Sequence, residues 1–224
     1  IDYVTISSTG NAANFGDLTQ ARYALGGASN DTRGLFIGGG SPSASDRIDW
    51  ITIASTGNAV DFGNCVANIR HIRGGAATPT RAVVAGGNES SNNVKRIQYV
   101  LIHTTGNSQD FGELTTGRHN MCGISNGIRG VWGGGNDPAS TNAMEYVTMT
   151  TLGNALDFGD LTVAERSRAG CASKIRGIFA GGGDPSSNVM EYITFATTSN
   201  SVDFGDLTGR ESFGGCSNAH GGLG

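Results

Sequence analysis

The sequence predicts an all-β protein, and three observations favour this fold class. Glycine accounts for 37 of the 224 residues, whereas proline accounts for only 4. Serine, threonine and asparagine are frequent, so short strands separated by tight turns are expected. Apolar runs are broken by Gly or Asn every few residues, which argues against a long amphipathic helix. A chain of this length can bury a sizeable core as one all-β domain.

One motif, built around Phe-Gly, recurs five times along the chain. Aligned on this motif, the repeats start near Ile1, Ile48, Ile97, Met144 and Met190. Residues 1–224 are therefore expected to form a single domain of five repeats of about 47 residues. This period accommodates about four short strands and is typical of a blade of a β-propeller.

Four strands follow one another in each repeat. In the fourth repeat they are expected at 144–149, 157–161, 168–171 and 176–180, with a Thr-Leu-Gly-Asn turn after the first. The first strand has apolar residues at both odd and even positions, so apolar side chains point to both faces, which suits a sheet covered on both faces. The third strand is rich in Gly, Ala and Cys in every repeat, as expected for crowded strands nearest a propeller axis. The fourth strand ends in two or three glycines.

The fourth strand and its glycines resemble the double-glycine strand of kelch propellers. The copies read Gly-Leu-Phe-Ile-Gly-Gly-Gly at 34–40, Ala-Val-Val-Ala-Gly-Gly at 82–87, Gly-Val-Trp-Gly-Gly-Gly at 130–135 and Gly-Ile-Phe-Ala-Gly-Gly-Gly at 177–183. The kelch tryptophan of the outer strand is missing, and the residues nearest to it in role are Phe15, Phe62, Phe111, Phe158 and Phe204. The resemblance implies a five-bladed kelch-like β-propeller with four-stranded antiparallel blades.

Closure of the ring is expected from the two ends of the chain. An inner strand is predicted from Arg210 to Ser217. Pairing of the C-terminal strands with residues 1–18 would complete the last blade and hide its exposed edges. An open array that continues into further residues is the alternative.

A second resemblance covers essentially the whole chain. The repeat Ile-Asp/Glu-Tyr-Val-Thr-Ile, followed by Thr-Gly-Asn-Ala-x-Asp-Phe-Gly-Asp-Leu-Thr, and the segment from Cys216 to Leu223 are similar to repeat proteins of marine bacteriophages, described as tail-fibre or virion proteins. The resemblance implies a non-enzymatic virion appendage module on the particle surface, which recognises or adheres to the host surface through variable loops. The implied partners are other virion proteins and a host-surface glycan or protein, and a homo-oligomer would multiply weak contacts.

Two alternatives stay open. One is a purely structural spacer or capsid decoration protein. The other is a cellular extracellular protein that binds carbohydrate or mediates adhesion. Neither nucleic acid nor membrane insertion is expected, because the net charge of −4 is scattered and no apolar run approaches the length of a membrane span.

Patterns for catalysis are lacking. The Asp-Phe-Gly motif of protein kinases occurs here in several copies without a kinase glycine-rich loop or His-Arg-Asp loop. The periodic acids are expected to cap turns or to accept bonds from backbone amides: Asp61, Asp110, Asp157 and Asp203. Four strand-opening arginines are expected to pair with carboxylates or carbonyls, with an anion-binding ring as the alternative: Arg33, Arg81, Arg129 and Arg176. We therefore expect no enzyme activity, no catalytic residue and no cofactor.

Cysteines and histidines indicate no metal site. The cysteines, which lack Cys-x-x-Cys spacing, are expected to be free and packed, with a contact between the repeat-equivalent pair Cys171 and Cys216 as an alternative. The histidines fall at unlike repeat positions, which argues against a metal cluster: His71, His103, His119 and His220. Trp50 and Trp132 lie in strand positions and are expected in the core.

The connections after the double glycines vary in length and sequence. They span 41–47, 88–96, 136–143 and 184–189, and their equivalence in the repeat predicts that they emerge on one side of the molecule. Varied loops on a regular scaffold are a common arrangement for recognition, although unconstrained drift explains the variation equally well. The candidate recognition residues are Ser41, Pro42, Asp46, Arg47, Glu89, Asn92, Lys95, Arg96, Asp137, Asn142, Asp184 and Asn188.

Overall fold

The computed structural model describes residues 1–183 and 185–216 and confirms the all-β class. Most strands belong to four four-stranded antiparallel sheets. The first sheet contains β3 (Gly26–Ser29), β4 (Arg33–Ile37), β5 (Ser45–Thr52) and β6 (Val60–Ile69). The second contains β7 (Gly75–Ala77), β8 (Arg81–Ala85), β11 (Arg96–Leu101) and β12 (Gln109–Glu113).

The remaining two large sheets repeat this order. The third contains β13 (Cys122–Ser125), β14 (Arg129–Gly133), β15 (Ala143–Thr148) and β16 (Leu156–Asp160). The fourth contains β17 (Ala169–Ala172), β18 (Arg176–Ala180), β19 (Ser187–Thr194) and β20 (Val202–Arg210). Two small sheets pair β1 (Asp2–Tyr3) with β2 (Ala13–Asn14), and β9 (Asn88–Glu89) with β10 (Asn92–Asn93).

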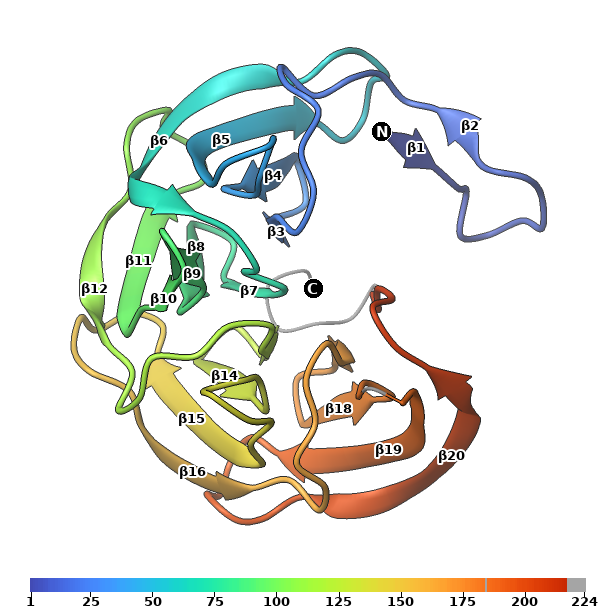
Figure 1. Ribbon diagram of the computed structural model, residues 1–224. Helices are drawn as coiled ribbons and strands as arrows, with labels where there is room; N and C mark the ends of the chain where they lie inside the picture. Colours follow the sequence, from blue (N-terminus) through green and yellow to red (C-terminus); the bar gives the residue numbers. More distant parts are fainter. Residues whose placement is uncertain (184, 217–224) are drawn as a thin grey trace.

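The four large sheets lie side by side around a common centre and form an open arc (Figure 1). Within each of these sheets the glycine-rich strand is innermost and the Asp-Phe-Gly strand is outermost. The four strands follow one another in chain order from the centre outward. The innermost strands approach one another closely. A Cβ atom on Gly75 of β7, for example, would lie 2.5 Å from the carbonyl oxygen of Gly27 in β3. Crowding at the centre therefore explains the small residues of these strands.

The core consists of three apolar clusters between successive sheets. Strand β8 illustrates the arrangement: Ala82 and Val84 pack toward the first sheet, whereas Val83 and Ala85 pack toward the third. Because side chains alternate along a strand, both parities must be apolar when a sheet is covered on both faces. Trp132 is completely buried, and Trp50 packs against the first cluster.

Backbone hydrogen bonds join each sheet to the next near the centre. The amide of His71 donates to the carbonyl of Ala24 at 2.8 Å, and that of Asn120 donates to His71 at 2.9 Å. The series continues from Ser167 to Asn120 at 3.0 Å and from Ser212 to Ser167 at 3.1 Å. All five residues have positive φ, so this series defines which residues are structurally equivalent.

The predicted five-bladed ring closed by its two ends is wrong. The structure contains four four-stranded sheets, none of the sheets closes into a barrel or propeller, and the arc stays open between β1–β2 and β20. Among the described residues, β1 pairs only with β2, and residues 211–216 form no strand. The predicted inner strand from Arg210 to Ser217 is therefore also wrong over its described part, in which only Arg210 is strand.

The sequence itself contains the physical reason for this difference. It has five Asp-Phe-Gly-type outer segments but only four Arg-led double-glycine strands, namely β4, β8, β14 and β18. A four-stranded sheet around β1 and β2 would need a fifth strand of that type next to β1.

The described part of the chain contains no helix that is long and apolar enough to cross a membrane.

Candidate recognition face

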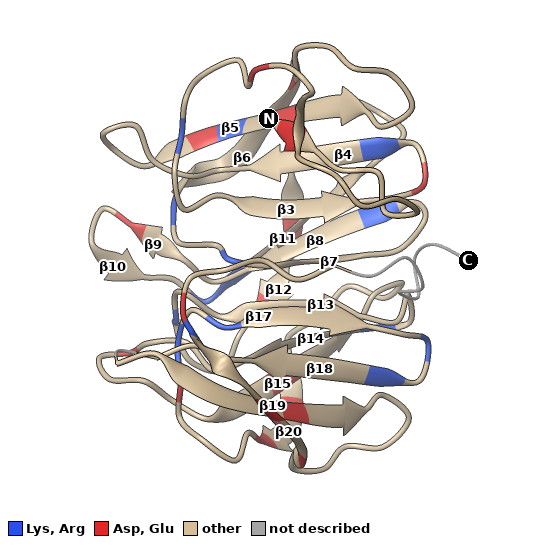
Figure 2. Cartoon of the chain, turned by 90° about the vertical axis from the view of Figure 1, so that its right-hand side faces the viewer, with Lys and Arg blue, Asp and Glu red and all other residues tan. Residues whose placement is uncertain are grey.

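The connections after the double glycines emerge on one side of the molecule, as predicted. Figure 2 shows the β9–β10 hairpin and the equivalent connections projecting to the left, whereas β4, β8 and β18 begin on the right. We call the left side the loop face. It contains the described residues of the connections at 41–47, 88–96, 136–143 and 185–189.

The predicted recognition residues divide into two groups. Those exposed are Pro42, Asn92, Lys95, Asp137 and Asn188. Those half-buried are Ser41, Asp46, Arg47, Glu89, Arg96 and Asn142. Asp184 lies outside the described residues. Only the first group presents most of its side chain to a partner.

Several half-buried residues brace the loops. Arg96 forms an ion pair with Glu89 at 3.3 Å across the base of the β9–β10 hairpin. The carbonyl of Arg47 accepts a hydrogen bond from the guanidinium of Arg22 at 2.6 Å. Asn142 donates from Nδ2 to the carbonyl of Leu161 at 3.4 Å. These contacts fix where the loops leave the sheets.

The structure adds a set of residues to this face, which we call the inner rim. Tyr23, Arg70 and His119 each form an isolated antiparallel bridge with the residue that follows a double glycine, and Gly183 donates to the carbonyl of Arg166 in the same way. The inner rim comprises Tyr23, Arg70, His119 and Arg166, together with the positive-φ residues that follow them: Ala24, His71, Asn120 and Ser167. One structural position therefore carries tyrosine, arginine, histidine and arginine in the four sheets.

Hydrogen bonds connect the inner rim to the loops. Arg70 donates from Nη1 to the hydroxyl of Tyr23 at 3.3 Å, and that hydroxyl donates to the carbonyl of Pro42 at 3.4 Å. His119 Nδ1 lies 2.7 Å from Asn93 Oδ1, and Asn93 donates from Nδ2 to Asp137 at 3.0 Å. The rim and three of the loops thus form one continuous polar surface.

The two rim histidines lie against each other, with ring centroids 5.7 Å apart. Burial lowers the pKa of His71, and the positive charges of Arg70 and Arg73 lower it further. Burial also lowers the pKa of His119, together with the charges of His71 and Arg166 and against the opposing effect of Asp137. Both imidazoles are consequently neutral near pH 7 and can donate and accept hydrogen bonds.

Buried ion pairs hold the segments that carry the rim. Arg22, next to Tyr23, binds Asp49 at 2.7 Å, and both side chains are completely buried. Arg118, next to His119, pairs with Glu145 in the same way, and Arg168 pairs with Glu191. Buried ion pairs therefore hold the backbone next to the variable rim residues in place.

Sequence reasoning missed the rim because these residues precede the glycine-rich strands instead of following the double glycines. Aligning the arginines would equate Arg70 with Arg22, but the hydrogen-bond series places Arg70 with Tyr23 and Ile69 with Arg22. The sequence did offer one signal for the rim: the residues just before the glycine-rich strands change type from repeat to repeat.

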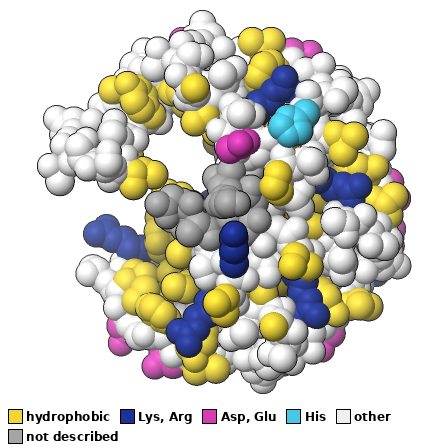
Figure 3. Space-filling model, turned by 180° about the vertical axis from the view of Figure 1, so that it is seen from behind, with side chains coloured by type: hydrophobic (Ala, Val, Ile, Leu, Met, Phe, Trp, Pro, Cys, Tyr) yellow, Lys and Arg dark blue, Asp and Glu magenta, His cyan; other side chains and the backbone are white. Residues whose placement is uncertain are grey.

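The opposite side of the molecule carries the strand-opening arginines. Figure 3 shows basic side chains spaced around the centre of this face. Arg33, Arg81 and Arg129 donate to the carbonyls of Ile102, Met149 and Phe195, respectively, at 2.6–2.8 Å. All four arginines also lie over an aromatic ring of their own sheet, 4.1–4.8 Å from its centroid. The predicted pairing with carbonyls is confirmed for three of them, so these arginines join sheets.

The periodic acids act only in part as predicted. Asp157 and Asp203 accept from the backbone amides of Gly159 and Gly205, respectively, two residues further on. This pattern is the short-range bond expected of an Asx turn.

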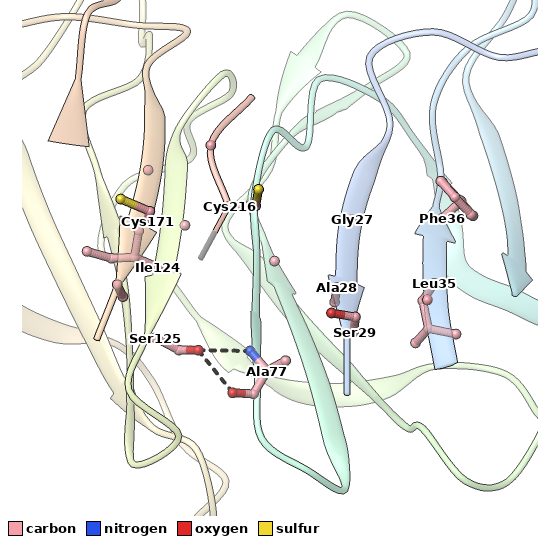
Figure 4. Close-up of a pocket in the computed structure, with 16 residues that line it drawn as sticks. Gly27, Ala28, Ser29, Leu35, Phe36, Ala77, Ile124, Ser125, Cys171 and Cys216 are labelled. Atoms are coloured by element: carbon pink, nitrogen blue, oxygen red, sulfur yellow. Dashed lines mark hydrogen bonds between the residues drawn. The ribbon is translucent and has the colours of Figure 1, made fainter. Parts of the chain in front are cut away.

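A cavity of about 420 Å³ lies at the centre of the arc (Figure 4). Its lining consists mainly of Gly, Ala and Ser of the innermost strands, and Ser125 both donates to and accepts from the backbone of Ala77. Cys171 and Cys216 also line it as free thiols. With few polar side chains, the cavity provides less for recognition than the loop face.

Three of the thiols are made poor nucleophiles by burial. Cys65 and Cys122 are buried and free, and burial raises the pKa of each to about 12. Burial also raises the pKa of Cys171. Among the described residues, no group of three or more His, Cys, Asp or Glu side chains could hold a metal ion. His220 lies outside them.

No model of a protein family matches the chain, and no curated protein matches it.

Proposed function

We propose that the protein is a non-enzymatic recognition module that binds a host-surface saccharide through the loop face. The observation that carries this proposal is the inner rim, where one structural position holds Tyr23, Arg70, His119 and Arg166 on an otherwise repetitive framework. A framework that repeats while one position at its surface varies, exposed as Tyr23 and half-buried as Arg70, His119 and Arg166, suits selective contacts better than a uniform structural role.

The chemistry of this face suits a polyol. Tyr23 is 51% exposed and provides an aromatic ring on which the apolar face of a sugar can stack. Asn93, Asp137 and the neutral His119 supply hydrogen-bond donors and acceptors within one connected set. Arg70 adds a cation at the edge of the same surface.

We place this module on a virion appendage such as a tail fibre, on the basis of the repeat resemblance described above. Weak contacts from each copy would be amplified if the appendage carries several copies. A location of the gene beside capsid or tail genes is the expected result. A location among cellular adhesion genes would favour an extracellular protein of a cell.

A screen of the purified protein against an array of bacterial surface glycans tests the binding function. We expect saturable binding that weakens about tenfold or more in Tyr23→Ala and Arg70→Ala, because each removes a side chain that the inner rim offers to the saccharide. Tyr3→Ala and Arg176→Ala are the matched controls, since they replace the same residue types away from the loop face. If the folded wild-type protein bound no glycan, the structural spacer would replace this proposal.

A further inference from the structure

The first strand, β1, has one open edge, whereas the equivalent strand of each large sheet is paired along that edge. In the four large sheets, the strand equivalent to β1 pairs on its inner side with an Arg-led strand. Each of these pairings joins five residues of the Arg-led strand to five residues of its partner. Among the described residues, β1 pairs only with β2 on its other side. Its inner edge therefore has the hydrogen-bonding groups of a sheet but no strand opposite them.

The side chains of this edge already have the arrangement that an Arg-led strand meets elsewhere. Tyr3 packs edge-on against Phe15, with centroids 5.8 Å apart and planes at 85°. The equivalent tyrosines Tyr99, Tyr146 and Tyr192 contact their phenylalanines at 5.7–6.1 Å and 77–84°. Each of these three tyrosines also carries an arginine over its ring, at 4.5–4.8 Å. Tyr3 is already packed against its phenylalanine in the same way, and its ring is 42% exposed.

The apolar surface around this edge is exposed in the same place. Val4 and Ile6 are 59% and 76% exposed. Across the opening, Phe204 of β20 is 48% exposed, whereas Phe15, Phe62, Phe111 and Phe158 are at most 7% exposed. Covering this surface would give the hydrophobic gain that the internal sheets already have.

The four internal strands define which segment fits. Their sequences are Arg-Gly-Leu-Phe-Ile, Arg-Ala-Val-Val-Ala, Arg-Gly-Val-Trp-Gly and Arg-Gly-Ile-Phe-Ala. The second residue is small because neighbours approach it closely: a Cβ atom on Gly177 would lie 2.2 Å from Cδ1 of Ile124. The shared pattern is therefore Arg, a small residue, an aliphatic residue, an aromatic or aliphatic residue, and a small or aliphatic residue.

We propose that the inner edge of β1 is a binding site for an extended peptide segment with this pattern. The segment adds to β1 as an antiparallel strand, in the mode known as β-strand addition. Its arginine pairs with Thr5 and lies over Tyr3, as Arg176 pairs with Thr194 and lies over Tyr192. Main-chain hydrogen bonds supply affinity, and the arginine–tyrosine contact supplies selectivity.

A labelled synthetic peptide tests the proposal. The probe has the sequence of residues 173–183, Ser-Lys-Ile-Arg-Gly-Ile-Phe-Ala-Gly-Gly-Gly, because its arginine pairs with a threonine and lies over a tyrosine of β19, as proposed for Thr5 and Tyr3. Fluorescence anisotropy with the whole protein is expected to show saturable binding. A peptide with Arg176→Ala is expected to bind about tenfold more weakly, as is the wild-type peptide to a Tyr3→Ala protein.

A double-mutant cycle locates the contact. Because the two changes remove the same interaction, their combined loss should be no larger than the greater single loss. Leu152→Ala is the control for a large exposed side chain elsewhere, and it should bind the peptide as the wild type does. Hydrogen exchange should slow at residues 1–6 when peptide is added.

Three results would overturn the proposal. One is the absence of saturable binding to the folded protein at millimolar peptide. Another is equal binding of the wild-type and Arg176→Ala peptides. The third is peptide-dependent protection confined to segments other than 1–6.

Discussion

Among the described residues, three buried arginine–carboxylate pairs stabilise the first, third and fourth sheets from within, and the second sheet has none. Arg22 and Asp49 are completely buried and 2.7 Å apart. At the equivalent places of the next repeat, Ile69 at the end of β6 and Gln98 in β11 are buried instead, and Gln98 accepts a hydrogen bond from Ser108 at 2.6 Å. A sheet can thus form without the ion pair. Where the charges are buried, however, each depends on the other, because an unpaired buried charge is costly.

Replacing one member of such a pair should therefore be strongly destabilising. We expect Asp49→Asn to lower the free energy of unfolding by about 3 kcal/mol or more, since Arg22 would keep its charge without a counter-ion. The matched control is Glu89→Gln, which breaks the partly exposed pair with Arg96 and should cost about 1 kcal/mol or less. Urea denaturation followed by circular dichroism measures both. Equal losses in the two variants would contradict the role given to burial.

The rim histidines make stability depend on pH in a defined direction. The pKa values of His71 and His119 are lowered in the folded protein, first of all by burial. The unfolded chain takes up protons near pH 6.5, whereas the folded protein does so only at lower pH. Between these values the unfolded state binds more protons, so stability is complete above about pH 6.5 and falls as the pH drops.

Thermal unfolding at a series of pH values tests this dependence. The melting temperature should decrease between about pH 7 and pH 5, a range above the usual pKa values of Asp and Glu. A double variant, His71→Gln with His119→Gln, should show a clearly smaller decrease. An unchanged pH dependence in this variant would mean that other groups cause the effect.

At the level of the strand, the glycine of Asp-Phe-Gly is explained by the junction between sheets. The glycine has positive φ in all five copies, and in four of them a Cβ atom would lie 2.2–2.5 Å from backbone atoms of the following turn. Those turns donate back: the amide of Gly153, for example, donates to the carbonyl of Phe111 at 2.8 Å. Gly205 in β20 is the exception, because nothing lies within 4 Å of its Cβ position.

Gly159 and Gly205 form a matched pair for measuring this junction. Both have φ +130° and lie in the same local sequence, Asp-Phe-Gly-Asp-Leu-Thr. Alanine at either position pays for the unfavourable φ, on the order of 1 kcal/mol. Only Gly159→Ala must also displace the backbone at Ser199, so we expect it to cost about 2 kcal/mol more than Gly205→Ala in urea denaturation. Equal costs would show that the junction yields easily.

The strands were easier to predict than their assembly. The predicted strand at 176–180 coincides with β18, and β15–β17 differ from their predicted bounds by one residue at each end, because period and glycine positions are local signals. The common side of the variable loops followed from the same repeat. The inner rim did not, since one residue inserted or removed between repeats moves Arg70 from the place of Arg22 to that of Tyr23. Such a shift is visible only in the hydrogen bonds between sheets.

At the scale of the whole molecule, the open arc makes the two ends unlike the middle. Each internal sheet is covered on both faces and contributes to apolar clusters on both sides. The pair β1–β2 has two residues in each strand, and both Tyr3 in β1 and Val4 directly after it are exposed. Counting repeats suggested five equivalent units, but the stability of a sheet depends on all four of its strands being present. This is why the repeat count failed to predict the architecture.

Hydrogen exchange should reveal this gradient of stability along the chain. A two-stranded sheet is marginal in water, so amides of β1 and β2 should exchange through local opening that costs about 0–2 kcal/mol. Amides of β8 and β11, buried between two neighbouring sheets, should exchange only through openings close to global unfolding, on the order of 5 kcal/mol or more. Mass spectrometry of the exchanged protein would resolve both segments in one experiment. Protection of β1 equal to that of β11 would mean that contacts beyond the pairing with β2 hold the N-terminal strand. That result would also remove the open edge on which strand addition depends.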